Sequence, residues 1–217
     1  MNYLEDIRNS VLECDKLLIG IGTSLEYSHD GALDVKSFED FYKGIKELVG
    51  DKDYYIITLS KDDLIFKYLG EDARVTAPCG SVSRYQCENA CVNIEDERFA
   101  NYDGRVILSV DEGTCPVCGG RLVPNNILAE HYAEEGYLKS FADYKKWLQG
   151  TVNRKLCILE LGVNLKYPGV IRFAFDKLCY YNQKSTFYRV DEKLYQHTAE
   201  NKERGISVPM KPIALFN

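Results

Sequence analysis

The segment KLLIGIGTS, residues 16–24, decides the fold of this 217-residue chain. Its apolar run has the length of a buried β-strand and leads directly into Gly20 and Gly22. Paired glycines after a strand often only make a tight turn, but they also open the dinucleotide-binding motif of α/β folds. The segment therefore predicts a central strand that ends at a glycine turn, and a nucleotide site is one of two open interpretations.

Predicted helices and strands alternate along most of the chain. Apolar residues at helical spacing predict helices over residues 4–12, 38–48, 64–69 and 140–150, and a further helix that begins at Pro168. Short apolar or β-branched runs predict strands over 53–58, 74–78, 105–110 and 155–162, and a last strand over 186–190. This alternation predicts an α/β fold with a Rossmann-like, mostly parallel sheet and helices on both faces.

Capping signals accompany two of the predicted helices. Ser37 with Asp40, and Ser60 with Asp63, have the spacing of residues that cap a helix N-terminus. Gly70 is placed to end the second of these helices, because glycine tolerates the left-handed conformation common at helix C-termini.

The composition is that of an ordinary globular protein, with 45% hydrophobic and 28% charged residues. The net charge of −6 disfavours a nucleic-acid partner, because the chain as a whole repels a phosphate backbone. The N-terminal residues are too acidic for a secretory signal, and the apolar runs are too short to cross a membrane. We therefore expect a soluble, cytoplasmic protein, in which clustered cysteines are more often metal ligands than disulfides.

Four of the eight cysteines form two close pairs, Cys87 with Cys91 and Cys115 with Cys118. Two such pairs can present four thiolates to one tetrahedral zinc ion, and a complete set of four thiolates makes the metal structural. Four buried thiols, or a redox pair at Cys115 and Cys118, are the alternatives. The expected domains are a Rossmann-like domain from residues 1–84 and 123–217 and a zinc-ribbon module from residues 85–122.

Three segments can reach the carboxyl edge of the sheet, where open α/β folds bind their ligands: residues 20–24, 58–62 and 162–164. In chain order with the cysteine pairs, they resemble the sirtuins, a family of NAD-dependent protein deacylases. Gly20–Ser24 is similar to the family's Gly-Ala-Gly-x-Ser, Thr58–Asp62 to Thr-Gln-Asn-Ile-Asp, Cys79–Ser81 to His-Gly-Ser, and Gly162–Asn164 to Gly-Thr-Ser. Weaker similarities lie at Val123-Pro124, Leu128–Glu130 and Val190-Asp191.

The resemblance implies that the chain binds NAD and uses it to remove acyl groups from lysines of a partner protein, with release of nicotinamide. The implied cofactor-binding residues are Gly20, Gly22, Thr23, Ser24, Ser60, Asp62, Gly162, Val163, Asn164 and Asp191. The implied catalytic positions are Ser60, Asp62 and Cys79. The implied partner is an acylated or ADP-ribosylated protein, with no nucleic acid and no membrane.

Some residues depart from the family's pattern. Cys79 stands where a sirtuin has its catalytic histidine, which acts as a general base on a ribose hydroxyl. A thiol there needs a lowered pKa to act as a base, could instead attack the ribose carbon as a thiolate, or could be a buried thiol without chemistry. Ser60 replaces an asparagine, Lys61 replaces an apolar residue, and the loop at residues 29–34 lacks the arginine that positions the pyrophosphate.

Two classes of function therefore remain open. The first is an enzyme, a sirtuin-like NAD-dependent deacylase with an altered catalytic site or a sirtuin-like ADP-ribosyltransferase. The second is a scaffold that binds NAD or ADP-ribose without turnover. Cys79 and the missing arginine favour altered or lost activity, whereas the glycine turn, Asp62 and Gly162 favour a retained cofactor site.

Overall fold

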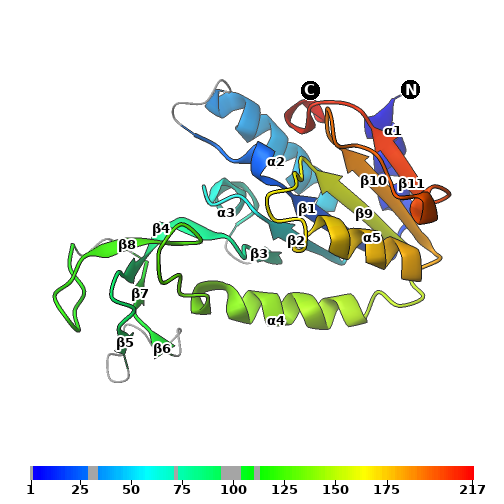
Figure 1. Ribbon diagram of the computed structural model, residues 1–217. Helices are drawn as coiled ribbons and strands as arrows, with labels where there is room; N and C mark the ends of the chain where they lie inside the picture. The colour runs from blue at the N-terminus through cyan, green and yellow to red at the C-terminus, as the bar shows by residue number, and fades with distance from the viewer. Residues whose placement is uncertain (1, 29–33, 71–72, 94–103, 110–112) are drawn as a thin grey trace.

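The main body of the protein is a six-stranded sheet, shown in Figure 1. The computed structural model describes residues 2–28, 34–70, 73–93, 104–109 and 113–217. The strands are β1 (Lys16–Ile21), β2 (Tyr54–Thr58), β3 (Val75–Thr76), β9 (Leu156–Leu161), β10 (Ser185–Val190) and β11 (Gly205–Val208). Their order is β11-β10-β9-β1-β2-β3, and every neighbouring pair is parallel. The predicted parallel sheet is thus confirmed.

Helices cover both faces of this sheet, as predicted. The first face packs against α1 (Tyr3–Glu13), α2 (Val35–Val49) and α3 (Leu64–Leu69), and the second against α4 (Glu135–Gln149) and α5 (Arg172–Tyr181) (Figure 1). Side chains alternate along β1, so that Leu17 and Ile19 contact the first set of helices and Leu18 contacts the second. Among the described residues, no helix is both long and apolar enough to cross a membrane.

A small module of short strands lies beside one end of the sheet (Figure 1). Its strands are β4 (Gly80–Cys87), β7 (Ile107–Leu108) and β8 (Leu122–Asn126), which form one antiparallel sheet, and β5 (Val92–Asn93) with β6 (Gly104–Arg105), which form another. Val106, Leu108 and Leu122 pack with Cys87 and Cys115 in its interior. A core this small gives little stability, so the module needs a further source of it.

Two strand predictions need correction. The single strand expected over 105–110 is instead β6 and β7, separated by Val106, and residue 110 lies outside the described residues. Val106 bonds to both ends of the first cysteine pair, because its N–H donates to Cys91 O and its carbonyl accepts the Cys87 N–H. The strand β10 is not the last, because β11 follows it at the sheet edge, where only Val208 is buried and the apolar signal is weak.

Two helix starts also differ from the prediction. α4 begins at Glu135, several residues before the expected start. α5 begins at Arg172 rather than at Pro168, whose carbonyl accepts the Phe173 N–H at the start of the helix. The turn that follows Pro168 is irregular, so the proline lies before the helix and is not its first residue.

The N-terminus of α2 is capped by a different residue from the one predicted. Asp34 precedes the helix, and its carboxylate accepts the Ser37 N–H at 2.7 Å, so Ser37 lies inside the first turn. An aspartate in this position satisfies one of the N–H groups that the helix leaves without a partner. The remainder of the loop in which the sequence lacks an arginine, residues 29–33, lies outside the described residues.

The start of α3 also departs from the predicted serine cap. Asp63 precedes the helix with φ of +58°, and Ser60 makes no capping bond to it. Asp62 instead accepts the Leu64 N–H at 3.0 Å, because its side chain lies nearer to the first turn. The C-terminus follows the prediction, since Gly70 ends the helix with φ of +99°.

We predict that Gly20→Ala lowers the free energy of unfolding by about 1–3 kcal/mol, the usual cost of overpacking a core. A Cβ at Gly20 would lie 2.6 Å from Ile171 Cγ2 and 2.7 Å from Phe175 Cε2, so α5 would have to move away from β1. Gly169→Ala is the control, because no atom lies within 4 Å of its Cβ position. Urea denaturation of both variants checks this, and equal losses would contradict it.

Candidate functional site

The candidate site lies at the carboxyl edge of the sheet. β9, β1 and β2 are neighbours, so the segments that follow them, residues 162–164, 22–24 and 59–62, lie side by side there. Asp191 directly follows β10 on the other side of β9. The structure therefore brings the predicted cofactor-binding segments to one edge, although it does not test their roles.

The turns after β1 and β9 are in backbone contact. A Cβ at Gly22 would lie 2.0 Å from the carbonyl oxygen of Gly162, which no side chain can do. Gly162 has φ of +62°, and a Cβ there would meet the hydroxyl of Ser24 at 1.9 Å. Both glycines are therefore required for the two turns to approach each other.

Side chains tie the same two turns together. The Ser24 hydroxyl donates to Gly162 O at 2.9 Å, and the Asn164 Nδ2 group donates to the Thr23 hydroxyl at 2.6 Å. In contrast, the backbone N–H groups of Val163 and Asn164 make no hydrogen bond within the part of the chain that the structure describes. Val163 is 1% exposed, so the Asn164 N–H is the donor of the two that is open at the edge, and such a backbone donor is the kind of group that binds an anion.

Asp191 stabilises the turn that follows β10. Its Oδ1 accepts the N–H groups of Lys193 and Leu194, both at 2.8 Å. Within the described residues, no donor contacts its second carboxylate oxygen. Asp191 thus offers one acceptor toward the edge while the turn holds the carboxylate in place.

Ser60 and Asp62 lie at the end of β2, as the sequence predicts, but their polar atoms face the protein interior. The carboxylate of Asp62 accepts the Tyr27 N–H at 2.5 Å and the Leu64 N–H at 3.0 Å, and so joins two loops. Burial raises the pKa of Asp62, although these hydrogen bonds oppose the shift. The hydroxyls of Ser60 and Tyr42 are also buried, and neither has a hydrogen-bond partner within the described residues. The Asp62 carboxylate thus has a structural role, whereas the Ser60 hydroxyl is enclosed without a bond.

Lys61 is neutralised by a glutamate from the turn after β1. Its ammonium group contacts the two carboxylate oxygens of Glu26 at 2.6 and 2.7 Å, and both side chains are largely buried. The charge that Lys61 brings to this edge is therefore compensated by a residue that the sequence analysis did not identify.

Cys79 lies beneath the edge in apolar surroundings. Its side chain is 2% exposed and packs with Leu59 and Val163. Burial raises the pKa of the thiol to about 11, and the nearby Lys61 ammonium only partly offsets this. The thiol is therefore protonated at neutral pH and lacks the lowered pKa that a base or nucleophile needs.

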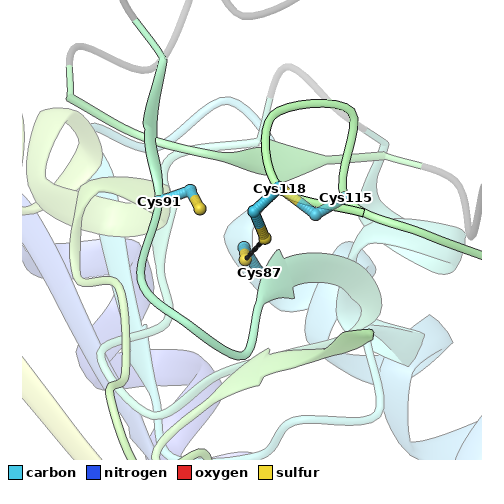
Figure 2. Close-up of side chains that lie close together, drawn as sticks. All are labelled: Cys87, Cys91, Cys115 and Cys118. Atoms are coloured by element: carbon cyan, nitrogen blue, oxygen red, sulfur yellow. Dashed lines mark hydrogen bonds between the residues drawn. The ribbon is translucent and has the colours of Figure 1, made fainter. Parts of the chain in front are cut away.

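The four predicted metal ligands converge in the small module, as Figure 2 shows. The sulfur atoms of Cys87, Cys91, Cys115 and Cys118 all lie within 4.8 Å of one another. A tetrahedral zinc site with bonds of about 2.3 Å places its sulfurs about 3.8 Å apart. The Cys87–Cys118 separation of 3.6 Å is close to that value, so the set could hold a zinc ion.

The second cysteine pair has the backbone geometry of a zinc knuckle. Gly119 has φ of +71°, and the Gly120 N–H donates to Cys118 Sγ at 3.3 Å. Asn89 Nδ2 donates to the same sulfur at 3.5 Å. These donors lower the pKa of Cys118 to about 6, which favours the thiolate that a metal requires. No cysteine forms a disulfide.

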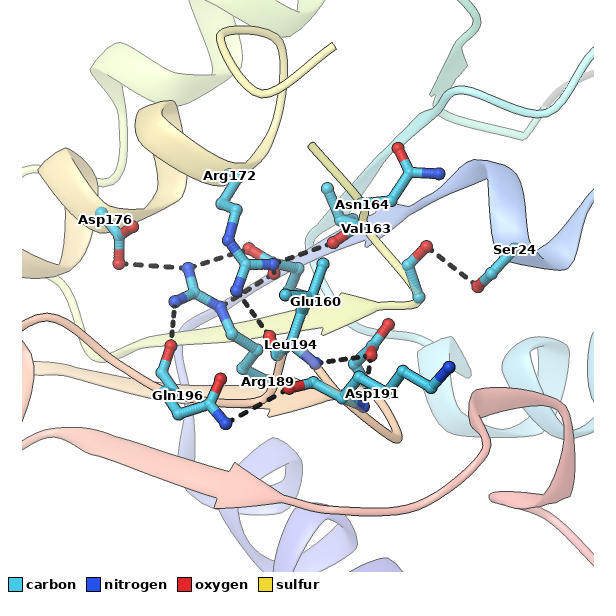
Figure 3. A network of polar contacts seen from close by, with 12 residues as sticks. Ser24, Glu160, Val163, Asn164, Arg172, Asp176, Arg189, Asp191, Leu194 and Gln196 are labelled. Carbon is cyan, nitrogen blue, oxygen red and sulfur yellow. Dashed lines mark hydrogen bonds and ion pairs between the residues drawn. The ribbon is translucent and has the colours of Figure 1, made fainter. Parts of the chain in front are cut away.

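A buried charge network, drawn in Figure 3, lies under the edge and was missed by the sequence analysis. Glu160 in β9 contacts Arg189 in β10 and Arg172 at the start of α5. The sequence did contain a signal for this network. β9 and β10 each carry one charged residue in an otherwise apolar run, and buried charges need partners. Glu160 and Arg189 are also register partners in the sheet.

The sequence matches no family model and no curated protein. Solved structures do match it. A Sir2 homologue in complex with NAD has a TM-score of 0.59 at 11% identity, covering 98% of this chain and 90% of that one. A mutant Sir2 homologue in complex with ADP-ribose has a TM-score of 0.57 at 12% identity, covering 98% and 93%. The chain therefore has the fold of Sir2 homologues over nearly its whole length.

We predict that the Cys79 thiol makes the protein less stable as the pH rises from about 9 to about 11. The raised pKa means that the unfolded chain loses this proton first, so stability is full below pH 9 and decreases until the folded thiol ionises. The slope is at most about 1.4 kcal/mol per pH unit. Denaturation of the parent and of Cys79→Ala at several pH values checks this. Parallel pH profiles would contradict the prediction.

Proposed function

We propose that this chain is a divergent sirtuin that binds NAD or ADP-ribose at the carboxyl edge of its sheet and does not complete the family's deacylation. The observation that carries the proposal is the pair of joined turns after β1 and β9, with the unused Asn164 N–H beside them. Solved Sir2 structures with NAD and with ADP-ribose share the fold and support the choice of ligand.

The residues at the edge fit the two polar parts of such a ligand. The N–H group of Asn164 would donate to the diphosphate, which depends on backbone donors because the loop at residues 29–34 has no arginine. The free oxygen of Asp191 would accept a ribose hydroxyl, as acidic residues at the ends of strands do in dinucleotide-binding folds. The proposed binding residues are Gly20, Gly22, Thr23, Ser24, Ser60, Asp62, Gly162, Val163, Asn164 and Asp191.

The three candidate catalytic residues support binding better than turnover. Bound NAD would supply an electrophilic ribose carbon. Cys79 cannot remove a proton from a ribose hydroxyl near pH 7, because its thiol is buried and keeps its own proton. The Asp62 carboxylate is bonded to two backbone N–H groups, and the Ser60 hydroxyl is buried. No described group at this edge replaces the missing histidine as a base.

Deacylation and ADP-ribosyl transfer are the competing functions. One solved Sir2 structure contains a p53 peptide with NAD and another contains a myristoylated histone peptide, which supports a peptide or protein partner. An acylated or ADP-ribosylated protein is accordingly the partner that we propose, as a bound ligand and not as a substrate.

We also propose that one structural zinc ion joins the four cysteines of the small module. The module's core is too small to fold alone, and its four sulfurs are already gathered. With four thiolates the coordination is complete, so the metal would stabilise and not react. In this proposal residues 85–122 form the zinc module, and residues 1–84 with 123–217 form the nucleotide-binding domain.

Calorimetric titration with ADP-ribose and NAD tests the ligand. We predict binding by the parent protein, and about tenfold weaker binding by Asp191→Asn, because the amide keeps its oxygen for the turn but loses the free acceptor. Asp51→Asn, at an exposed turn after α2, is the matched control and should bind as the parent does. Absence of binding to the parent at millimolar ligand would refute the proposed function.

Metal analysis tests the module. We predict one zinc ion per chain in the parent, loss of the zinc in Cys115→Ser, and retention in Cys14→Ser, whose thiol lies outside the cluster. A chelator should lower the melting temperature of the parent, because metal binding is coupled to folding of the module. Well under one zinc per chain in the parent would show that the cysteines are only buried thiols.

A further inference from the structure

Two buried arginines lie directly behind the proposed ligand edge. Arg189 is 1% exposed and Arg172 is 8% exposed, and both contact Glu160, which is 1% exposed. Arg189 bonds to the two carboxylate oxygens of Glu160 at 2.8 and 3.1 Å, and Arg172 bonds to one of them at 3.2 Å. Asp176 accepts a further bond from Arg189 at 3.1 Å, so two positive and two negative charges balance.

Other N–H groups of the two guanidinium groups bond to backbone carbonyls of the edge loops. Arg172 donates to Val163 O at 2.8 Å in the turn after β9, and to Leu194 O in the turn after β10. Arg189 donates to Gln196 O at 2.6 Å in that second turn. Figure 3 shows these bonds converging from both loops on the two arginines. Arg172 therefore bonds directly to both loops.

The bond from Arg172 determines where an unused donor points. In a trans peptide the C=O and the following N–H point in opposite directions, and the described residues contain no cis peptide. Because Val163 O points inward to Arg172, the Asn164 N–H points away from it. That N–H is the exposed edge donor that has no partner in the described chain.

A contribution to the stability of the fold does not by itself explain why these four charges are buried together. Burial lowers the pKa of Arg172 and raises the pKa of Glu160, which means that the protein interior disfavours both charges. Buried ion pairs of this kind contribute little more to stability than well-packed apolar residues, whereas they do impose one geometry. The planar guanidinium suits this task, because its donors form a rigid fork.

We propose that Arg172 and Arg189 are positioning residues that hold the turns after β9 and β10 in the arrangement that binds the nucleotide. The proposal rests on the proposed function for the identity of the ligand. The part of the proposal that concerns structure is that the Arg172 guanidinium holds both loops, and this part does not depend on any ligand.

The test compares Arg172→Met with Arg172→Lys and with the double variant Glu160→Gln/Arg172→Met, which removes the unpaired buried charge if the single variant folds poorly. Arg204→Met is the matched control, because Arg204 also donates to a backbone carbonyl, that of Cys179 at the opposite end of α5. Melting temperatures of all variants report how much each change costs in stability.

Amide hydrogen exchange is the ligand-free readout. In Arg172→Met and in the double variant we expect exchange about tenfold faster at Lys166, Lys193 and Leu194, whose N–H groups are bonded within the two turns. The β1 amides should exchange as in the parent, and Arg204→Met should leave both turns unchanged. Unchanged exchange in the turns of the double variant would overturn the inference.

Calorimetric titration with ADP-ribose is the second readout. We expect about tenfold weaker binding in Arg172→Met and in the double variant, partial recovery in Arg172→Lys, and parental affinity in Arg204→Met. If the parent binds and the double variant binds equally well, the inference is wrong and the proposed function survives. If the parent does not bind, the proposed function fails, and the exchange experiment still decides whether Arg172 holds the loops.

Discussion

The backbone contact between Gly22 and Gly162 is the constraint on which the rest of the edge depends. It brings the ends of β1 and β9 within van der Waals distance, so Ser24 can reach across to Gly162 O and Asn164 can reach Thr23. Since those side chains are used to hold the turns together, the groups left for a ligand are mainly backbone N–H donors. The glycines therefore act here through packing between two loops, and the phosphate-binding role that we propose depends on that packing.

The polar groups around this contact are mostly bonded to one another. Asp62 joins two loops, Lys61 is paired with Glu26, and Cys79 is sealed in an apolar environment. A general base must reach the proton that it removes, whereas the Cys79 thiol is buried and Asp62 and Lys61 are bonded to other groups of the protein. What the edge retains is shape and hydrogen-bonding capacity, which are the properties of a binding site.

The strand and helix alternation was sufficient to predict the parallel sheet, because apolar runs of strand length between amphipathic helices leave few other arrangements. The spacing of the four cysteines was also sufficient to predict that they lie together. Features that depend on tertiary contact were not predictable. β11 is a half-exposed edge strand with little apolar signal, and Asp34 competes locally with Ser37 as a cap. Glu160 and Arg189 became a pair only once β9 and β10 were known to be neighbours.

The most direct test of binding without deacylation is the mass of acylated lysine peptides incubated with NAD and the zinc-loaded protein at neutral pH. We predict that the peptides keep their acyl groups, because Cys79 remains protonated and no described residue at the edge replaces the missing histidine as a base. NAD-dependent loss of the acyl group from any peptide class would contradict binding without deacylation, and would show that this edge carries out the chemistry of a deacylase.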